Sequence, residues 1–168
     1  MQQFIGTKIV NAKPMDRYDY VTLRGWGLPA DEDGTDEGYL VEYLDGGKSN
    51  VEGFSGYVSW SPKEVFINAY STSGSLTFGD ALIVLKAGGK VARAGWNGKG
   101  MWLVLVPGTP NIVPRKGSPY SDAGVTEEVE ILSHIDMYTV NSAGRRAMLP
   151  GWLASQTDML SSDWCIVD

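Results

Sequence analysis

Five consecutive small residues, 71–75, carry no apolar side chain and divide the chain into two short stretches. Such a segment cannot bury a face against a core and is typical of a flexible linker. The formal charge changes at the same place: residues 1–74 have a net charge of −5, whereas residues 75–168 have a net charge of −1. We therefore expect two small modules, at residues 1–72 and 76–168, rather than one domain with a single core.

Composition is typical of a globular protein, with 43% apolar and 20% charged residues. The longest uninterrupted apolar run, 101–106, is far shorter than the about 20 residues of a membrane-spanning helix, so we expect no membrane segment. The first residues lack the basic region and apolar stretch of a secretory signal, which favours a cytoplasmic protein. A net charge of −6 repels nucleic acid and anionic membranes, and the single cysteine, Cys165, excludes an intrachain disulfide.

The first module is predicted to be a small β-rich unit with one helix. Alternating and β-branched patterns predict strands at residues 7–12, 38–44 and 56–60. Ser61 is predicted to cap a helix that runs to about Tyr70, with Pro62 at the first helical position and Glu64 completing a capping box. Its buried face is predicted to consist of Val65, Phe66 and Ala69.

The second module is predicted to open with a helix that begins after Thr77, with Asp80 three residues later as a capping partner. Its apolar face has i, i+3, i+4, i+7 spacing and consists of Phe78, Ala81, Leu82 and Leu85. Strands are predicted at residues 90–93, 101–106, 131–140 and 164–167, a long loop at 107–126, a turn at 141–144 and a short helix over 152–160. The fold class is therefore α+β, with a short antiparallel sheet and one main helix in each module.

An acidic segment, 31–37, contains five carboxylates. Its glycine stands at the fourth position, whereas a calcium-binding EF-hand loop requires glycine at the sixth. The sequence therefore favours a solvated acidic loop, and we expect no metal site.

Candidate catalytic groups are few. His134 is the single histidine, and it shares a strand face with Asp136, two residues later. Together with Asp158 these residues have the side-chain types of a metal or acid–base site, but the sequence does not specify the distances between the three side chains that such a site requires. The alternative is a hydrogen-bonded polar pair that orients nearby loops.

The tryptophans are more informative. Trp102 and Trp164 lie in apolar strand patterns and are predicted to belong to the core. Trp96 and Trp152 lie instead in polar, turn-like segments. An indole beside hydrogen-bonding side chains suits the recognition of a base or a sugar, because the ring stacks while the polar groups bind edges. The pattern is equally compatible with two indoles that cover the edge of the core.

Several runs of the second module, in order along the chain, resemble the second type of Thoeris anti-defence protein, a small phage and prophage domain. The resemblance covers about residues 75–168, and its most specific motifs are RxGWNGKGM, from Arg93 to Met101, and WLASQTDM, from Trp152 to Met159. The remaining runs are 76–82, 134–137 and Asp163-Trp164.

The resemblance implies a molecular sponge rather than an enzyme. Members of that family bind the cyclic ADP-ribose derivative made by the bacterial Thoeris defence system and hold it intact, and some sequester cyclic dinucleotides. They assemble as homotetramers with ligand pockets at subunit contacts. By resemblance we expect a protein without a cofactor that acts in the cytoplasm of the infected bacterium.

The resemblance also implies which residues form the ligand pocket. Trp96 would stack on the adenine or its neighbour, beside Asn97, while Arg93 would neutralise a phosphate. The other wall would consist of Trp152, Ala154, Ser155, Gln156, Thr157 and Asp158, with the hydroxyls donating to phosphate oxygens and Asp158 accepting from a ribose or a base amine.

Residues 1–74 are additional to that family domain. The run 56–63 resembles a short module found beside this domain in phage proteins, and its role is open. A nucleotide-processing enzyme that uses His134, Asp136 and Asp158, or a structural interaction module of a phage particle, are the alternatives to a sponge.

Overall fold

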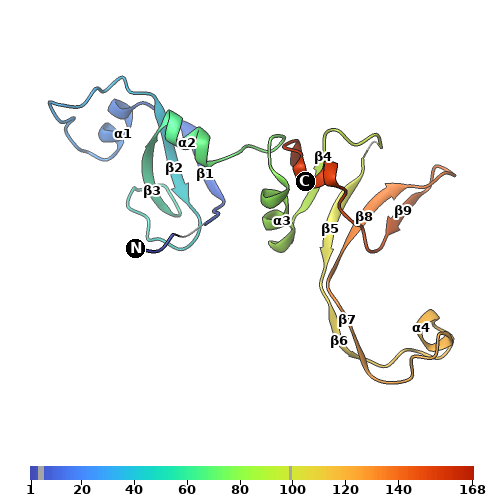
Figure 1. Ribbon diagram of the computed structural model, residues 1–168. Helices are drawn as coiled ribbons and strands as arrows, with labels where there is room; N and C mark the ends of the chain where they lie inside the picture. Colours follow the sequence, from blue (N-terminus) through green and yellow to red (C-terminus); the bar gives the residue numbers. More distant parts are fainter. Residues whose placement is uncertain (4–5, 99) are drawn as a thin grey trace. The chain divides into compact units, whose positions relative to one another are not determined.

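The computed structural model describes residues 1–3, 6–98 and 100–168, and the chain divides into two compact units, Met1–Ser71 and Thr72–Asp168 (Figure 1). Both units combine an antiparallel sheet with short helices, which confirms the α+β class. The longest helix in the described ranges, α3 (Phe78–Lys86), has nine residues and is too short to cross a bilayer.

The first unit is built on one antiparallel sheet. Its strands, in spatial order, are β1 (Val10–Pro14), β2 (Gly38–Tyr43) and β3 (Tyr57–Pro62). Two seven-residue helices complete it, α1 (Arg17–Leu23) and α2 (Lys63–Ala69), so the prediction of one main helix is wrong here. Strand β2 buries both Leu40 and Val41, and successive strand residues face opposite sides, so both faces of this small sheet are covered. The helices contribute Val21 and Phe66 to the core.

The first strand lies later than the sequence pattern indicated, and α1 was not predicted. Pairing of Val10 with Tyr43 and of Pro14 with Tyr39 sets the bounds of β1. The helix α1 buries only Val21, so it has no apolar periodicity that a sequence pattern could detect. Its local signal is the cap at Asp16, whose carboxylate accepts from the backbone N–H three residues later.

The capping box predicted at Ser61 is wrong. Ser61 pairs with Tyr39 as part of β3, which extends to Pro62, so its side chain does not cap the helix. The helix therefore begins at Lys63 without a side-chain cap. Of the face that was predicted to be buried, Phe66 is buried, whereas Val65 is 59% exposed and Ala69 is also exposed.

The acidic segment contacts the start of α1. The Arg17 guanidinium binds Glu32 at 2.8 Å and Asp36 at 3.1 Å. Asp33 accepts from the backbone N–H of Thr35 at 2.9 Å, which lowers the pKa of the Asp33 carboxyl. Several of these carboxylates are therefore used to hold the loop in place.

The second unit is built on a five-stranded antiparallel sheet with α3 on one face. Its strands, in spatial order, are β10 (Trp164–Val167), β4 (Lys90–Arg93), β5 (Trp102–Val106), β8 (His134–Val140) and β9 (Arg146–Leu149). The capping box of α3 is confirmed, because Thr77 and Asp80 bond reciprocally. The helix packs Ala81 and Leu85 against Leu103 and Trp164 of the sheet.

The long segment 107–126, predicted to be a loop, instead forms most of an ordered arm. Its elements are β6 (Thr109–Ile112), the short helix α4 (Pro119–Asp122) and β7 (Val129–Ile131). Figure 1 shows this arm extending away from the sheet beyond β5 and β8. The strand predicted at 131–140 is consequently divided, because β7 pairs with β6 while β8 pairs with β5. Proline at position 107 has no N–H to donate, which interrupts the ladder where the arm leaves the sheet.

The segment 71–75 is not a free linker over its whole length. The backbone N–H groups of Gly74 and Leu76 donate to the carbonyl oxygen of Trp164, at 3.0 and 3.1 Å. The Ser73 hydroxyl accepts from the N–H of Ile166 at 2.9 Å. Small polar residues therefore pair with β10 here. Their composition is the same as that of a flexible, solvent-exposed linker, so composition could not reveal this pairing.

Near the C-terminus, the observed helix is shorter than the helix predicted at 152–160. It is α5 (Gln156–Leu160), so Trp152 precedes the helix. The turn at 141–144 is confirmed by a bond from the N–H of Gly144 to the carbonyl of Asn141, and it leads into β9, which was not predicted. Trp164 is completely buried, as predicted, whereas Trp102 is half-buried and stacks on Tyr138 with ring centres 4.9 Å apart.

Candidate functional site

The motifs RxGWNGKGM and WLASQTDM meet at one place in the second unit. The first motif begins at the end of β4, and the second leads into α5, which packs against α3. Antiparallel pairing of β4 with β10 places Arg93 opposite Trp164 and beside Asp163. We call Arg93, Trp96, Asp158 and Asp163, which bond to one another, the arginine–aspartate network.

Arg93 lies at the centre of this network. Its Nη1 donates to Asp158 Oδ1 at 2.7 Å, and its Nε donates to Asp163 Oδ1, also at 2.7 Å. A third bond, from Nη2 to Asp163 Oδ2 at 3.4 Å, makes the contact with Asp163 two-pronged. The Arg93 side chain is only 10% exposed, and the two carboxylates raise its pKa further above the physiological range.

Asp158 receives four donors from within the chain. Oδ1 accepts from Arg93 and from the Trp96 indole N–H at 3.0 Å. Oδ2 accepts from the Ser155 backbone N–H at 3.0 Å and from the Ser155 hydroxyl at 2.7 Å. A carboxylate offers about four lone-pair positions, so its hydrogen-bonding capacity is used internally. Burial by itself raises the pKa of this carboxyl, but the hydrogen bonds from Ser155, Trp96 and Arg93 outweigh it and hold the pKa far below its usual range.

Asp163 is a network residue to which sequence reasoning gave no role, although it stands in one of the resembling runs. Besides Arg93 it binds the backbone N–H of Gly95 through Oδ2 at 2.7 Å. The Arg93 guanidinium holds the pKa of Asp163 below its ordinary value. A Cβ added to Gly95 would lie 2.8 Å from Asp163 Oδ2, so a larger residue here would displace the Asp163 carboxylate from its bonds.

Next to the network lies an aromatic cluster of four rings. Trp96 and Trp152 meet edge to face with ring centres 6.0 Å apart, and both contact the buried Trp164 at 5.5 and 6.3 Å. Phe78 of α3 completes the cluster at 5.5 Å from Trp164. The indole N–H of Trp164 donates to the Asp158 carbonyl at 3.0 Å. Trp96 and Trp152 are half-buried, so each contributes to the core and also presents part of its ring to solvent.

The predicted ligand residues other than Trp96 and Trp152 fall into two groups. Arg93, Ser155 and Asp158 are bonded within the chain, because Asp158 accepts from both Arg93 and Ser155 and Arg93 also donates to Asp163. Asn97, Gln156 and Thr157 are exposed, whereas Ala154, two residues after Trp152, is half-buried. None of the three exposed residues has a side-chain hydrogen bond within the described residues. Lys99, which belongs to the first motif, lies outside the described residues.

His134 and Asp136 form the polar pair of the alternative interpretation. Their Nε2 and Oδ1 atoms are 3.5 Å apart, and Asp136 is buried and accepts from the backbone N–H of Gly151 at 3.1 Å. They face the side of β8 opposite Ile135 and Met137, which pack against the core that contains Trp164. Asp158 bonds instead to Arg93 and Trp96 in the network. Across residues 1–3, 6–98 and 100–168, no group of three or more acidic, histidine or cysteine side chains is arranged to hold a metal ion.

Comparison with known protein families identifies the family to which the second unit is related. The sequence profile of the Thoeris anti-defense 2-like domain matches residues 76–167, more than half of the chain and nearly all of the second unit. The chain belongs to the Thoeris anti-defense 2-like family. It is also 35% identical over 94 residues to the protein named Thoeris anti-defense 2 of Bacillus phage SP01, a match that covers 55% of this chain and 94% of the phage protein.

The Thoeris anti-defense 2-like domain thus contains the arginine–aspartate network, the aromatic cluster and the arm. The first unit lies outside the match. The family's name refers to opposition to a defence system and names no reaction.

Proposed function

We propose that this protein is a phage anti-defence sponge, which binds a cyclic nucleotide immune signal of the cyclic ADP-ribose or cyclic dinucleotide type and holds it intact. The observation that carries the proposal is the pair of half-buried indoles, Trp96 and Trp152, which meet edge to face, with Trp96 bonded to Asp158 of the network. An indole face stacks on a base, and stacking is worth about 1–3 kcal/mol per base.

Fixed geometry favours tight binding. Trp96 is oriented by its bond to Asp158, which is itself fixed by Arg93 and by the cap of α5. A site that is ordered before the ligand arrives loses little conformational entropy on binding, as a sponge that competes with an effector requires. We assign Arg93, Ser155 and Asp158 a positioning role, and the direct polar contacts to the exposed Asn97, Gln156 and Thr157.

Sequestration without cleavage is consistent with the chemistry of the site. The Asp158 carboxyl has a strongly lowered pKa and four internal donors, so it is a poor general base and has no free lone pair for a reacting proton. Loss of ligand binding, rather than loss of turnover, is therefore the expected effect of changes at the site.

We further propose a homo-oligomer, of which a tetramer is the expected form, that acts in the host cytoplasm. The arm supports self-association, because no side chain between residues 107 and 133 is buried. A two-stranded hairpin by itself is marginally stable in water. Contact with another copy would supply the packing that the arm lacks in a single chain.

The test is calorimetric titration of the full chain with cyclic ADP-ribose isomers and cyclic dinucleotides, followed by heat denaturation and chromatography of the released ligand. We expect binding by at least one of them and release of an unchanged molecule. Altered ligand would assign an enzyme instead, and absence of binding to every compound would overturn the proposal.

Two variants locate the site. Trp152→Leu removes the stacking surface and should weaken binding roughly 5- to 150-fold, the equivalent of about 1–3 kcal/mol. Asn97→Ala removes an exposed polar side chain outside the core and should also weaken binding. Asn68→Ala is the matched control, because Asn68 is exposed on α2 of the other unit, and it should bind as the wild type does. Equal affinity of all three variants would place the ligand elsewhere.

A further inference from the structure

A groove crosses the first unit beside the starts of α1 and α2. It consists of two adjoining hollows of about 600 and 430 Å³, which share Thr35, Glu37 and Lys63. Both hollows are open to solvent rather than enclosed. Small-molecule sites usually bury most of their ligand, so an open groove is better suited to a chain segment.

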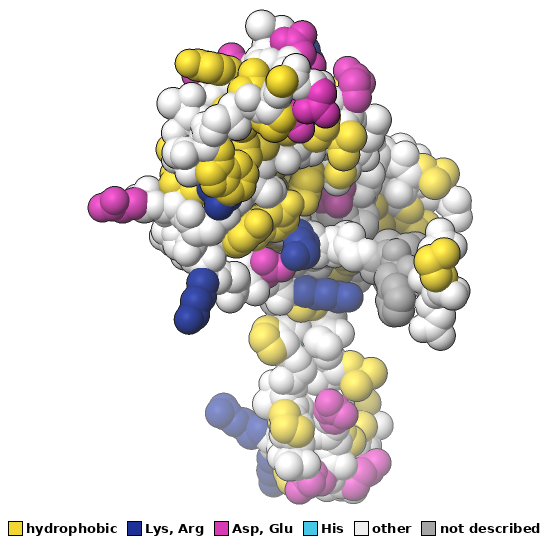
Figure 2. Space-filling view, turned by 90° about the vertical axis from the view of Figure 1, so that its left-hand side faces the viewer, with side chains coloured by type: hydrophobic (Ala, Val, Ile, Leu, Met, Phe, Trp, Pro, Cys, Tyr) yellow, Lys and Arg dark blue, Asp and Glu magenta, His cyan; other side chains and the backbone are white. Residues whose placement is uncertain are grey.

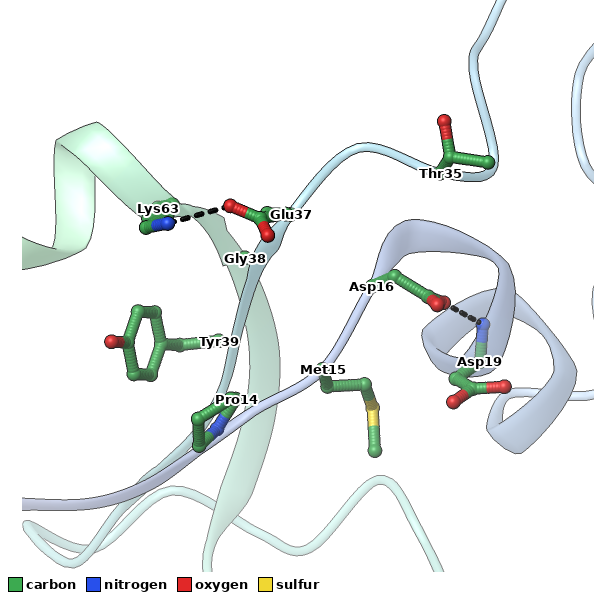
Figure 3. Close-up of a pocket in the computed structure, with 9 residues that line it drawn as sticks. All are labelled: Pro14, Met15, Asp16, Asp19, Thr35, Glu37, Gly38, Tyr39 and Lys63. Atoms are coloured by element: carbon green, nitrogen blue, oxygen red, sulfur yellow. Dashed lines mark hydrogen bonds and ion pairs between the residues drawn. The ribbon is translucent and has the colours of Figure 1, made fainter.

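The larger hollow combines an apolar floor with acidic walls. Figure 3 shows Pro14, Met15 and Tyr39 beneath the hollow, with the carboxylates of Asp16 and Asp19 on the α1 side. The Tyr39 ring is held by stacking on Phe66, with ring centres 4.1 Å apart.

Two of its carboxylates have no cationic partner in the described part of the chain. Glu37 is paired with Lys63 at 2.6 Å (Figure 3). The Asp16 carboxylate accepts only from the backbone N–H of Asp19, and neither Asp16 nor Asp19 forms an ion pair within the described ranges. The wall on the α1 side therefore carries two uncompensated negative charges next to apolar surface.

Charge and geometry limit what this groove accepts. The first unit carries a net charge of −5, which repels nucleic acid. Its carboxylates do not converge as metal ligands within the described ranges. The complementary occupant is a segment in which apolar residues adjoin two cationic side chains.

The arm of the second unit carries such a segment. Arg115 and Lys116 are exposed and follow Val113 and Pro114 directly, and Val113 is 63% exposed. In Figure 2 the lower lobe, which is the arm, has its Lys and Arg side chains on one side and acidic side chains on another. Within the described ranges, neither cation forms an ion pair.

We propose that the groove of one copy binds residues 113–116 at the arm tip of a second copy. Val113 and Pro114 lie on the apolar floor, while Arg115 and Lys116 pair with Asp16 and Asp19. This inference rests on the homo-oligomer in the proposed function but not on ligand binding. It gives the first unit a role in assembly and makes that contact dependent on ionic strength.

Variants of the full chain with altered charges test this contact, and sedimentation measures their self-association. The groove variant is Asp16→Asn with Asp19→Lys, since asparagine preserves the cap of α1. The tip variant is Arg115→Glu with Lys116→Glu. Each should weaken self-association at least tenfold at low salt, and the combination of all four changes should restore most of it. The control Asp31→Lys alters the charge of an exposed residue outside the groove and should associate as the wild type does.

A disulfide trap keeps the test decisive if other contacts hold the assembly together. In a Cys165→Ser background, Asp19→Cys with Lys116→Cys should give covalently linked chains on a non-reducing gel, whereas Asp31→Cys with Lys116→Cys should not. Unchanged association in both charge variants together with no linked chains would overturn the inference. Calorimetry on the same variants reports ligand binding separately, so failure of the sponge proposal is distinguishable from failure of this one.

Discussion

Replacing Asp158 by asparagine tests whether the arginine–aspartate network supports the second unit. Asparagine keeps the shape of the side chain but has one acceptor oxygen instead of two. Its NH₂ group must therefore face either Arg93 and Trp96 or the N–H of Ser155, all of which are donors. The buried guanidinium also loses one of its two carboxylate partners.

The size of the effect follows from burial. Removing one partner of a buried ion pair destabilises a protein by about 3–5 kcal/mol. Arg93 retains Asp163, so we expect the lower limit, a loss of about 3 kcal/mol in the free energy of unfolding of the second unit. With an m-value of about 1.5 kcal/mol/M, the urea midpoint falls by about 2 M.

Urea unfolding followed by tryptophan fluorescence measures this shift, because four of the six tryptophans lie in the second unit. Asp122→Asn is the matched control, since Asp122 is exposed on the arm, and it should leave the midpoint unchanged. A midpoint for Asp158→Asn equal to that of the control would refute the argument, because the four donors to Asp158 would then contribute nothing to stability.

The remaining predictions concern pH, capping and close packing. Because the pKa of Asp158 is lower in the folded chain, its contribution to stability is complete above its unfolded-state pKa of about 3.9 and is lost as the pH falls through the folded value. The stability difference between wild type and Asp158→Asn should thus shrink below about pH 4, and a difference that grew on acidification would contradict this sign. Ser155→Ala should lower the free energy of unfolding of the second unit by about 1–2 kcal/mol, as measured by urea unfolding. Ser61→Ala should leave the stability of the first unit nearly unchanged, because Ser155 caps a helix and Ser61 does not. Gly38→Ala places a Cβ 2.3 Å from an indole carbon and should destabilise the first unit by about 1–3 kcal/mol, while Gly27→Ala meets open space and should not; equal midpoints would refute the close approach.

Elements defined by short-range interactions were predictable from the sequence. The capping box at Thr77, the apolar spacing of α3 and the strands at 90–93 and 164–167 depend on residues a few positions apart, and the structure confirms them. The same local argument was wrong at Ser61, because pairing with β2 draws that residue into a strand. Local patterns hold where no distant partner competes for the same residue.

The candidate site shows the same limit. Sequence motifs selected Arg93, Trp96 and Asp158, and the structure brings these three into direct contact. They did not reveal that Arg93 and Asp158, 65 positions apart, bond to each other. A sequence motif shows that an aspartate is present, but it does not show whether the carboxylate binds a ligand or a guanidinium of the same chain.

The sequence by itself determined the α+β class, the family and three of the four network residues, Arg93, Trp96 and Asp158, but not Asp163. Only the tertiary structure decided which of those side chains are used internally, that residues 107–133 form an arm, and that a serine-rich segment pairs with β10. The physical reason is that strand register and the connections between strands bring together side chains that are many tens of residues apart in the sequence. No local pattern encodes such long-range contacts, whereas a helix cap, a turn or an amphipathic face is defined by residues only a few positions apart.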